Sequence, residues 1–546
     1  MIKILKSQLF FVLIGLIFCL PIIIPYIKSG YFPSHDGEWA VVRAGEMFRE
    51  IRDLQFPPRY SSVLNFGYGY PLFNFAYPFP YYLATVFHML HIGFTDSIKL
   101  IFAASVMGSF MGMFYLSLYF WKNKVLAFAS GILYVYLPYR LVDLFVRGSI
   151  GESIAFCIYP LLVLSLLLIT SPKRRNWGIF STAILIPILI TTHNISAVFF
   201  GIIFLAYILA LCASKKYTEA LFSFLAIVWG GLISAYFIFP ALLEKQNIKL
   251  SKIPIADRNL YFVSIQKLIM PTWGYGTPTD TNPFTYQIGV PHICTWLFSI
   301  VAIRRAKNFE KSLGVSFLVL SLILAIMMFP ISAFVWRLPL LSDINYPWIL
   351  LLPIGFIICF ISGALTHIKY GVYISLLAAL ASILMFMPYA APSKTINFGD
   401  EYYLTNEATT TSSNELMPLW VKELPTQHFD QKIVTKGVIS DLEVKSNRIY
   451  FNVVLLKPER TRINQIYYPG WKAFVNEAST PISYENKQGI MTIPLPSGNS
   501  QVMLLFAETP LRLLSNSVTL LSLIGLGCFM SITIFTVLKH RKKKNT

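Results

Sequence analysis

Charged residues are scarce in this sequence. They make up 13% of its 546 residues, whereas 55% are hydrophobic and 15% are aromatic. Soluble domains carry about 25% charged residues, so the composition excludes an ordinary soluble protein. Apolar runs of about 20 residues, the length that crosses a bilayer, recur along the chain. The sequence therefore predicts a polytopic α-helical membrane protein.

The sequence also lacks the patterns in which cysteine binds metal or builds a disulfide framework. All six cysteines fall in apolar runs, without a CxxC pair or a Cys/His spacing typical of zinc. We expect neither disulfides nor a structural metal. The first apolar run, Leu9 to Ile27, lacks a small-residue cleavage site after it. We expect an uncleaved signal anchor with a cytoplasmic N-terminus.

The net charge of +19 is distributed over short loops. Lysine and arginine collect between apolar runs, as in "SPKRRNW" (171–177) and "RRAKNFEK" (304–311), and in the tail "KHRKKKNT" (539–546). Such residues mark cytoplasmic loops. Alternating from a cytoplasmic N-terminus puts every basic loop inside. We expect a multi-pass cell-membrane protein with both termini cytoplasmic and with no nucleic-acid partner.

This alternation predicts about twelve spans. They are 8–27, 97–120, 125–141, 152–170, 177–192, 195–213, 219–240, 290–303, 312–331, 344–366, 370–389 and 514–538. The chain then divides into a transmembrane domain (1–389) with outer loops 28–96 and 241–289, an extracytoplasmic β-rich domain (390–513), and a last helix with a basic tail (514–546).

The outer segments have periodicities of their own. Apolar residues recur at helical spacing in 41–54 with charges largely on the other side, which predicts an amphipathic helix on the membrane surface. The apolar piece 80–92 is too short to span. Strand-like runs separated by turns predict a small antiparallel, sandwich-like β domain. These runs are 448–456, 465–476, 489–496 and 500–508.

His35, Asp36 and Glu38 form an acidic cluster directly after the first apolar run. A carboxylate there lies at the depth of lipid head groups and could deprotonate an acceptor hydroxyl as a general base. His35 or Glu38 could tune it or share a metal. Because aspartate also favours the N-cap position, Asp36 could instead simply cap the following helix.

Other outer stretches carry candidate substrate-binding residues. The stretch 57–82 is rich in aromatic residues and amides, which suit sugars, although an interfacial aromatic belt has a similar composition. Arg147 could clamp a phosphate or could pair structurally with Glu152. His193 could act in a site or be a hydrogen-bonded turn residue. The full set is Arg59, Tyr68, Tyr70, Asn74, Tyr77, Arg147, Glu152, His193, Asn194, Gln287 and Arg337.

Several motifs together resemble a bacterial integral membrane family labelled "6-pyruvoyl-tetrahydropterin synthase-related". They are "HDGEW" (35–39), "GYGYPLFNFAYPFPYYL" (67–83), "VRGSIGESIAF" (146–156), "TTHNISA" (191–197) and "NELMPLW" (414–420). The β segment around "YYPGWKAFVN" (467–476) is similar to the outer domain of YfhO-like proteins. His35-Asp36 resembles the acidic motif of GT-C glycosyltransferases. Relatives often carry "FPWR" where this chain reads "YPWI" (346–349), so Ile349 stands in place of an arginine.

The resemblance implies a GT-C-like fold and a glycosyltransferase. Such an enzyme would move a hexosyl or pentosyl group from a polyprenyl-phosphate carrier to a cell-envelope glycan, lipid or protein on the outer face. Asp36 would be the catalytic carboxylate, and Arg147, with Arg59 or Arg337, would hold the leaving phosphate. No cofactor is required, with Mg²⁺ or Mn²⁺ as an alternative. Pterin synthase chemistry is not expected, because neither a zinc-binding histidine set nor a soluble fold is visible.

Two other functions stay open. A transporter or lipid flippase would show internal repeats and charges near the membrane midplane. A non-catalytic sugar-binding protein would use the β domain and would not depend on the acidity of Asp36.

Overall fold

The computed structural model describes residues 7–406 and 408–545, with side chains up to 538. Eight helical segments of this part are long and apolar enough to cross a membrane. They are α2 (Gln8–Ile27), α6 (Phe94–Trp121), α9 (Ile150–Ile169), α11 (Asn194–Ala213), α16 (Asn308–Met327), η7–α17–η8 (Pro347–His367), α18–η9 (Gly371–Tyr389) and α20 (Pro510–Asn545), the last with its apolar part ending at Leu538.

Two further segments are bent. α7 (Lys124–Val135) meets α8–η1 (Pro138–Arg147) at 44°, and α12 (Tyr217–Ile233) meets α13 (Ala235–Leu243) at 74°. Pro138 lacks the N–H that would continue the first helix, which explains the break before it. Counting each bent pair as one span gives ten. The protein is therefore a helical polytopic membrane protein.

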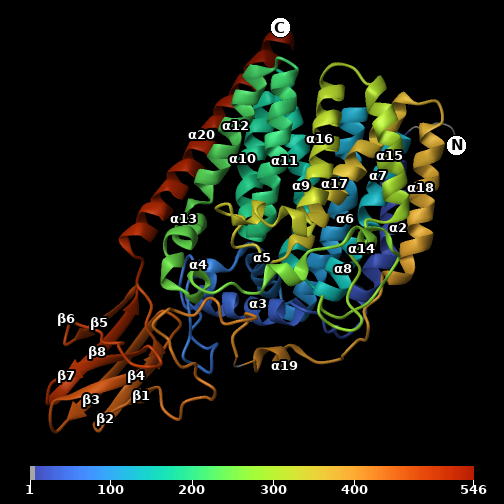
Figure 1. The fold of residues 1–546 in the computed structure, drawn as a ribbon. Helices are drawn as coiled ribbons and strands as arrows, with labels where there is room; N and C mark the ends of the chain where they lie inside the picture. The colour runs from blue at the N-terminus through green and yellow to red at the C-terminus, as the bar shows by residue number, and fades with distance from the viewer. Residues whose placement is uncertain (1–6, 407, 546) are drawn as a thin grey trace.

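The described residues give eight to ten candidate spans, where the sequence predicted about twelve. The predicted spans 177–192 and 290–303 form helices α10 (Arg175–Thr192) and α15 (Val290–Arg305), which stand among the others (Figure 1). α15 has only 16 residues, and α10 begins with the polar Arg175 and Asn176. Apolarity around these segments was correctly detected, but neither helix is both long and apolar enough to count as a span.

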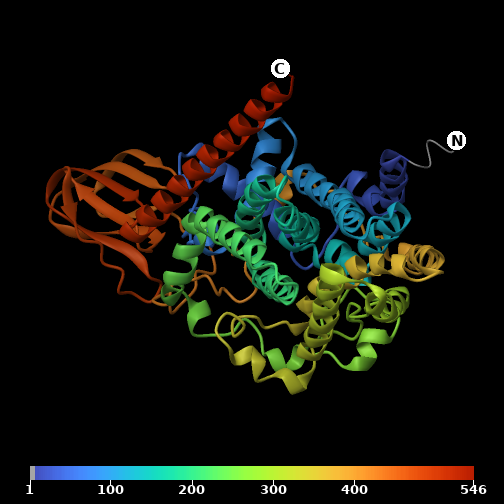
Figure 2. The same ribbon diagram turned by 90° about the horizontal axis from the view of Figure 1, so that it is seen from above.

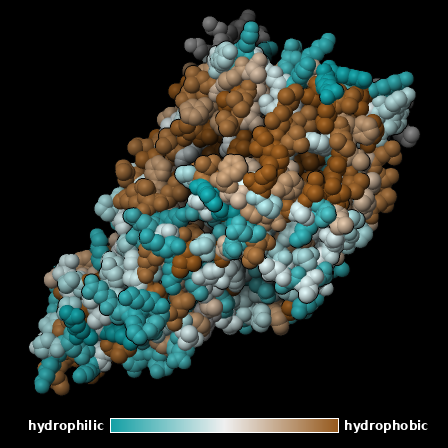
Figure 3. All heavy atoms as spheres, in the orientation of Figure 1, coloured by the Kyte–Doolittle hydropathy of each residue, from teal (hydrophilic) through white to brown (hydrophobic). Residues whose placement is uncertain are grey.

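The helices stand side by side, and the long connecting segments gather at one end of the bundle (Figures 1 and 2). That end carries α4 (Leu72–Phe75), α5 (Phe79–Met89), α14 (Ile265–Ile269), α19 (Asp400–Leu404) and the β strands. Hydrophobic side chains cover much of the helical part, and hydrophilic ones cover much of the β strands (Figure 3). This distribution suits a bundle surrounded by lipid with a solvated end.

Helix α3 (Gly37–Arg52) lies across this end of the bundle (Figure 1). The sequence predicted an amphipathic helix on the membrane surface, but two of its acidic side chains are buried inside the protein: Glu46 and Glu50 are 4% and 0% exposed. Ser61 donates a 2.6 Å hydrogen bond to Glu46, and both carboxylate oxygens of Glu50 have no partner among the described residues. The periodicity located the helix but could not show that the first loop folds back over it.

The β region (433–506) consists of two antiparallel sheets with strand orders β1-β4-β7 and β2-β3-β8-β5-β6. The strands are β1 (Ile433–Val434), β2 (Val438–Val444), β3 (Arg448–Leu455), β4 (Glu459–Ile466), β5 (Trp471–Val475), β6 (Ala478–Thr480), β7 (Ile490–Leu495) and β8 (Gly498–Phe506). The predicted runs contain β3, β5, β7 and most of β8. The other four were missed because they are short, exposed or, like β4, rich in polar residues.

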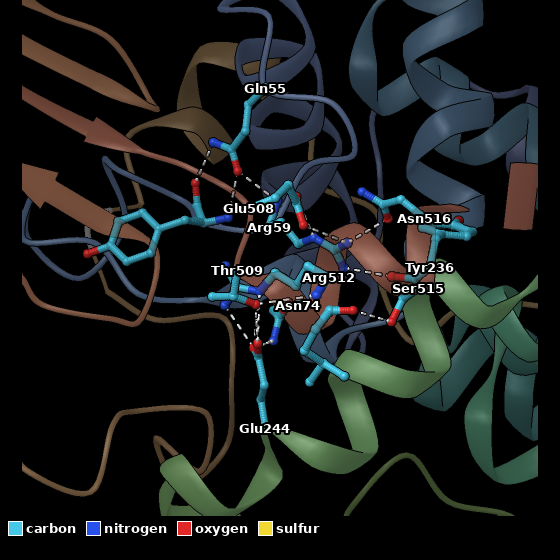
Figure 4. A network of polar contacts seen from close by, with 12 residues as sticks. Gln55, Arg59, Asn74, Tyr236, Glu244, Glu508, Thr509, Arg512, Ser515 and Asn516 are labelled. Carbon is cyan, nitrogen blue, oxygen red and sulfur yellow. Dashed lines mark hydrogen bonds and ion pairs between the residues drawn. The ribbon is translucent and has the colours of Figure 1, made fainter. Parts of the chain in front are cut away.

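A buried ion pair joins α20 to α13 (Figure 4). The Arg512 guanidinium donates to Glu244 from Nη2 at 2.8 Å and from Nε at 3.0 Å. Asn74 of the first loop donates to the same carboxylate at 2.8 Å. Arg512 is fully buried. Both charges are thus neutralised where water cannot reach them, and three distant segments meet at one carboxylate.

A second ion pair lies beside the first (Figure 4). Arg59, 1% exposed, pairs with Glu508 at 3.1 Å. It also donates to the carbonyl oxygen of Tyr236 at 2.8 Å and to Asn516 Oδ1 at 3.2 Å. We call the Arg512 and Arg59 networks together the joint, because they connect the β region and α20 to the bundle.

Removing one charge of the joint should destabilise the protein strongly. Glu244→Ala leaves the buried Arg512 guanidinium without its carboxylate, which typically costs ~3–5 kcal/mol. The measurement is the thermal unfolding of the purified protein in detergent. Glu443→Ala is the control, because it removes only exposed pairs with Arg448 and Lys445 and should not change the melting temperature. Equal melting of both variants and wild type would contradict a structural role for the joint.

Glu50 should make stability depend on pH. Burial raises its pKa well above the ordinary 4.5, and Glu46 and Asp53 raise it further. The folded protein therefore keeps this proton at pH values where the unfolded chain has lost it, so stability falls as pH rises above ~4.5. Glu50→Gln should thus raise the melting temperature relative to wild type more at about pH 8 than at about pH 5. A pH-independent difference would contradict this.

Candidate functional site

Two backbone hydrogen bonds hold the acidic cluster against the end of the bent α7–α8–η1 segment. The amide of His35 donates to the carbonyl of Val146 at 3.0 Å, and the amide of Asp36 donates to that of Arg147 at 2.8 Å. Gly148 follows with φ +62°, and a Cβ there would lie 2.9 Å from the Gly37 nitrogen. Only glycine tolerates both this conformation and this close approach.

Asp36 occupies the N-cap position of α3, but its side chain makes no capping bond. The serine two residues earlier takes that role, because Ser34 Oγ accepts from the Gly37 amide at 3.1 Å. The carboxylate of Asp36 is half-buried and accepts no hydrogen bond from any described residue. A plain helix cap therefore does not account for this aspartate.

Arg147 lies next to Asp36 and is held on three sides. Its Nη1 donates to the Tyr139 hydroxyl at 2.9 Å and pairs with Glu152, which accepts from that hydroxyl at 2.7 Å. The guanidinium lies over the ring of Trp348, 4.8 Å from the ring centre. Its Nε and Nη2 have no hydrogen-bond partner in the described part of the chain. These two donors are available to a ligand, in the planar geometry that suits a phosphate.

The N-termini of three helices meet here. α3 begins after Asp36, α9 begins after Ser149, and α11 begins after His193. The start of α9 lies close to the end of α10. A Cβ at Gly151 would clash with the carbonyl oxygen of Thr192, the last residue of α10, and would lie 2.8 Å from the Tyr77 ring. Helix N-termini favour anions through their unpaired N–H groups and the helix dipole.

His193 has a defined tautomer. The Ser196 amide donates to its Nδ1 at 3.3 Å, and the Ser196 hydroxyl lies 2.7 Å from the same atom. Nδ1 is therefore an acceptor, and the proton of the neutral ring sits on Nε2. Burial lowers the pKa of His193 to about 4, so the ring is neutral near pH 7. The ring packs edge to face with Tyr77, with 5.6 Å between centroids.

The structure thus brings several predicted site residues into one place, which we call the Asp36 cluster. It contains His35, Asp36, Tyr77, Arg147, Glu152 and His193.

Within the cluster, His35 Nε2 lies 3.1 Å from the carbonyl oxygen of Tyr275. Two other predicted residues, Glu38 and Asn194, border the cluster. Glu38 is half-buried in the first turn of α3, and burial raises its pKa while Lys394 opposes this. Asn194 starts α11, and its Oδ1 is buried without a partner among the described residues.

The remaining predicted residues lie in other surroundings. Arg59 and Asn74 belong to the joint, where the Arg59 guanidinium pairs with Glu508 and the Asn74 amide donates to Glu244. Gln287 donates to the carbonyl oxygen of Thr272 at 3.0 Å. Arg337 is exposed, without a contact to the cluster in the described residues. Neither Arg59 nor Arg337 is therefore placed to share a phosphate with Arg147.

Tyr68 and Tyr70 pack the first loop against later parts of the chain. The hydroxyl of Tyr70 lies 3.0 Å from Thr410 Oγ1, and the ring of Tyr68 meets that of Phe429 edge to face at 5.1 Å. Both tyrosines are buried. They do not form an open aromatic surface for a sugar.

Sequence reasoning missed three residues of the site: Ser34, Tyr139 and Trp348. Tyr139 lies eight residues before Arg147, and Trp348 lies within "YPWI". Ile349, where the family resemblance led us to expect an arginine, is buried next to Trp348. The sequence feature that could have pointed to Trp348 was therefore the unexpected Ile349 next to it. It is the tryptophan, however, that contacts Arg147.

No group of three His, Cys, Asp or Glu side chains within the described residues could hold a metal ion. In the Asp36 cluster, Glu152 is already engaged by Arg147 and Tyr139. These residues do not form a ligand set for Mg²⁺ or Mn²⁺, which prefer several oxygen ligands.

The fold and the site define a polytopic helical membrane protein with a small two-sheet β region and a charged cluster at one end of its bundle. Residues 73–391 match the family described as "6-pyruvoyl-tetrahydropterin synthase related domain; membrane protein". The chain belongs to this family. No curated protein matches it.

Two solved structures share part of the fold. The archaeal oligosaccharyltransferase AglB from Archaeoglobus fulgidus, in complex with an inhibitory peptide and a dolichol-phosphate, is 11% identical with a TM-score of 0.46, covering 76% of this chain and 61% of that one. The mycobacterial arabinofuranosyltransferase AftD is 14% identical with a TM-score of 0.45, covering 72% and 27%. This chain spans less than two thirds of either protein.

The capping geometry can be tested by stability. Ser34→Ala removes the acceptor of the Gly37 amide and should cost about 1 kcal/mol. Asp36→Ala, two positions away, should leave the melting temperature unchanged because its carboxylate makes no capping bond. Thermal unfolding in detergent measures both. If Asp36→Ala melted as early as Ser34→Ala, Asp36 would be a structural cap after all.

Proposed function

We propose that this protein is a membrane glycosyltransferase of the GT-C type, which moves a sugar from a polyprenyl-phosphate carrier to a cell-envelope acceptor on the outer face of the membrane. One observation carries the proposal. The unpartnered carboxylate of Asp36 is fixed by backbone hydrogen bonds beside Arg147, whose guanidinium keeps two donors free. A candidate base and a candidate phosphate-binding group thus lie together at the end of the bundle, at the level we propose for a lipid head group.

In the proposed reaction, Asp36 accepts the proton of the acceptor hydroxyl. The oxygen of an acceptor hydroxyl attacks the anomeric carbon of the donor sugar and forms the new glycosidic bond. The hydroxyl proton passes to the Asp36 carboxylate. The bond between the anomeric carbon and the phosphate oxygen breaks, and polyprenyl phosphate leaves with the electron pair. Such general-base catalysis typically contributes about 10²–10⁴-fold to the rate.

Arg147 stabilises the leaving phosphate through Nε and Nη2. Glu152, Tyr139 and Trp348 hold the guanidinium in place, so it does not need to be ordered when the donor binds. The N-termini of α9 and α11 add a favourable field for the same anion. In this proposal Arg147 alone binds the phosphate, since Ile349 stands where the family resemblance led us to expect a second arginine.

His193 and Tyr77 offer contacts to the sugar. His193 presents an N–H on Nε2, which can donate to a sugar hydroxyl, and Tyr77 presents a ring and a hydroxyl beside it. Because His193 is neutral near pH 7, it adds no charge that would compete for the phosphate. The sugar therefore lies between these side chains and Asp36.

The test compares wild type and Asp36→Asn in lipid vesicles with a panel of polyprenyl-phosphate sugars, following release of the free carrier phosphate. We expect turnover in wild type and a loss of about 10²–10⁴-fold in Asp36→Asn, with unchanged melting. Arg147→Lys should lose activity too, because lysine lacks the planar fork that binds phosphate.

Arg337→Ala is the matched control, since this exposed arginine lies outside the cluster and should retain full turnover. If Asp36→Asn turned over as fast as wild type, Asp36 would not be the general base. No turnover in wild type with any donor of the panel would refute the transferase and favour a transporter or a binding protein.

A further inference from the structure

α20 packs loosely against the rest of the bundle. Only 11% of its spanning part is buried, against 67% for α6 and 78% for α9. It runs along the outside of the bundle from the β region to the opposite end (Figures 1 and 2). Apart from the joint, a few polar contacts hold it. The Tyr236 amide donates to Thr519 at 2.8 Å, and Trp229 Nε1 donates to the Ser522 carbonyl at 3.0 Å.

Three hollows follow one another between α20 and the neighbouring elements. The first, of about 520 Å³, involves α20 residues 516–523. The second, of about 450 Å³, reaches from Ser522 to Phe529 and includes Trp229. The third, of about 220 Å³, lies beside Lys173 and reaches Val537. A groove of this length along a spanning helix is open to the hydrocarbon of the bilayer.

The first hollow is polar at one end and apolar at the other. Leu520 and Leu523 line its apolar part, and the ring of Phe56 lies at the other end beside that of Tyr82, with 6.3 Å between centroids. At its polar end, the hydroxyls of Tyr82 and Tyr236 and the Nδ2 of Asn516 have no hydrogen-bond partner among the described residues. Seven residues separate Asn516 from Leu523, or about 10 Å of helix. The polar end lies at the start of α20, next to the joint, and the apolar end lies deeper in the span.

We infer that the first hollow binds one acyl chain of a bilayer phospholipid, whose ester or phosphate oxygens accept hydrogen bonds at the polar end. The order of polar and apolar groups along the hollow matches the order along a phospholipid that enters from the same membrane face. Its volume is within the range of ligand pockets, about 300–1,000 Å³. A second protein helix would leave the three polar groups unsatisfied against an apolar surface.

The same geometry predicts little selectivity for the charge of the head group. Arg59 is the nearest cation, and its N–H groups already donate to Glu508, Tyr236 and Asn516. The donors left for the lipid are neutral. Zwitterionic and anionic phospholipids should therefore bind equally well, which separates this hollow from the phosphate-binding Arg147.

The experiment uses the full protein in detergent with phosphatidylcholine that carries a photoreactive group in one acyl chain. After illumination, the labelled peptides are identified by mass spectrometry. We expect adducts on 516–523 and at Tyr82 or Tyr236. Leu523→Trp fills the hollow and should lower the yield of these adducts about tenfold. A change of this size corresponds to an acyl chain that buries about two methylene groups fewer in the hollow. Leu520→Trp should act in the same way.

Leu521→Trp is the matched control, because Leu521 is 68% exposed and lines none of the three hollows. It should leave the adducts unchanged. A phosphatidylglycerol probe should label to within about twofold of phosphatidylcholine. Equal labelling in all three tryptophan variants would overturn the inference. So would a strong preference for phosphatidylglycerol, or cross-linking of α20 to a second protein chain in place of lipid.

Discussion

The arrangement of the site depends on the two backbone hydrogen bonds that connect residues 35–36 with residues 146–147. Backbone bonds of this kind do not depend on which side chains are present, so they fix the chain before any side chain acts. The left-handed Gly148 makes them possible, because it ends the helical segment at Arg147 and leaves its last carbonyls free. Asp36, Arg147 and the starts of three helices take their positions from this contact.

Around that contact, charges are arranged according to the cost of burying them. Arg147 and Glu152 neutralise each other, as do Arg512 and Glu244 in the joint. A buried ion pair of this kind contributes little net stability, but loss of one partner is costly, so it fixes which segments must meet. Asp36 differs because it is half-buried and its carboxylate has no ion-pair partner among the described residues.

The sequence predicted the features that local patterns encode. Apolar runs located the bundle helices, period-two runs located four strands, and a short motif singled out Asp36. The same patterns failed where the deciding partner is distant. Arg59 and Glu508 are 449 residues apart, so spacing could not show that this arginine belongs to the joint. The buried side of α3 and the broken spans were missed for the same reason, because packing between distant segments determines both.

The short connection between β8 and α20 has a mechanical consequence. β8 ends at Phe506 and α20 begins at Pro510, and the joint grips both sides of this link through Glu508 and Arg512. Because the link is short and an ion pair holds each side of it, the β region has little freedom to turn relative to the start of α20. A molecule bound to its sheets would therefore stay at a nearly fixed distance from the joint.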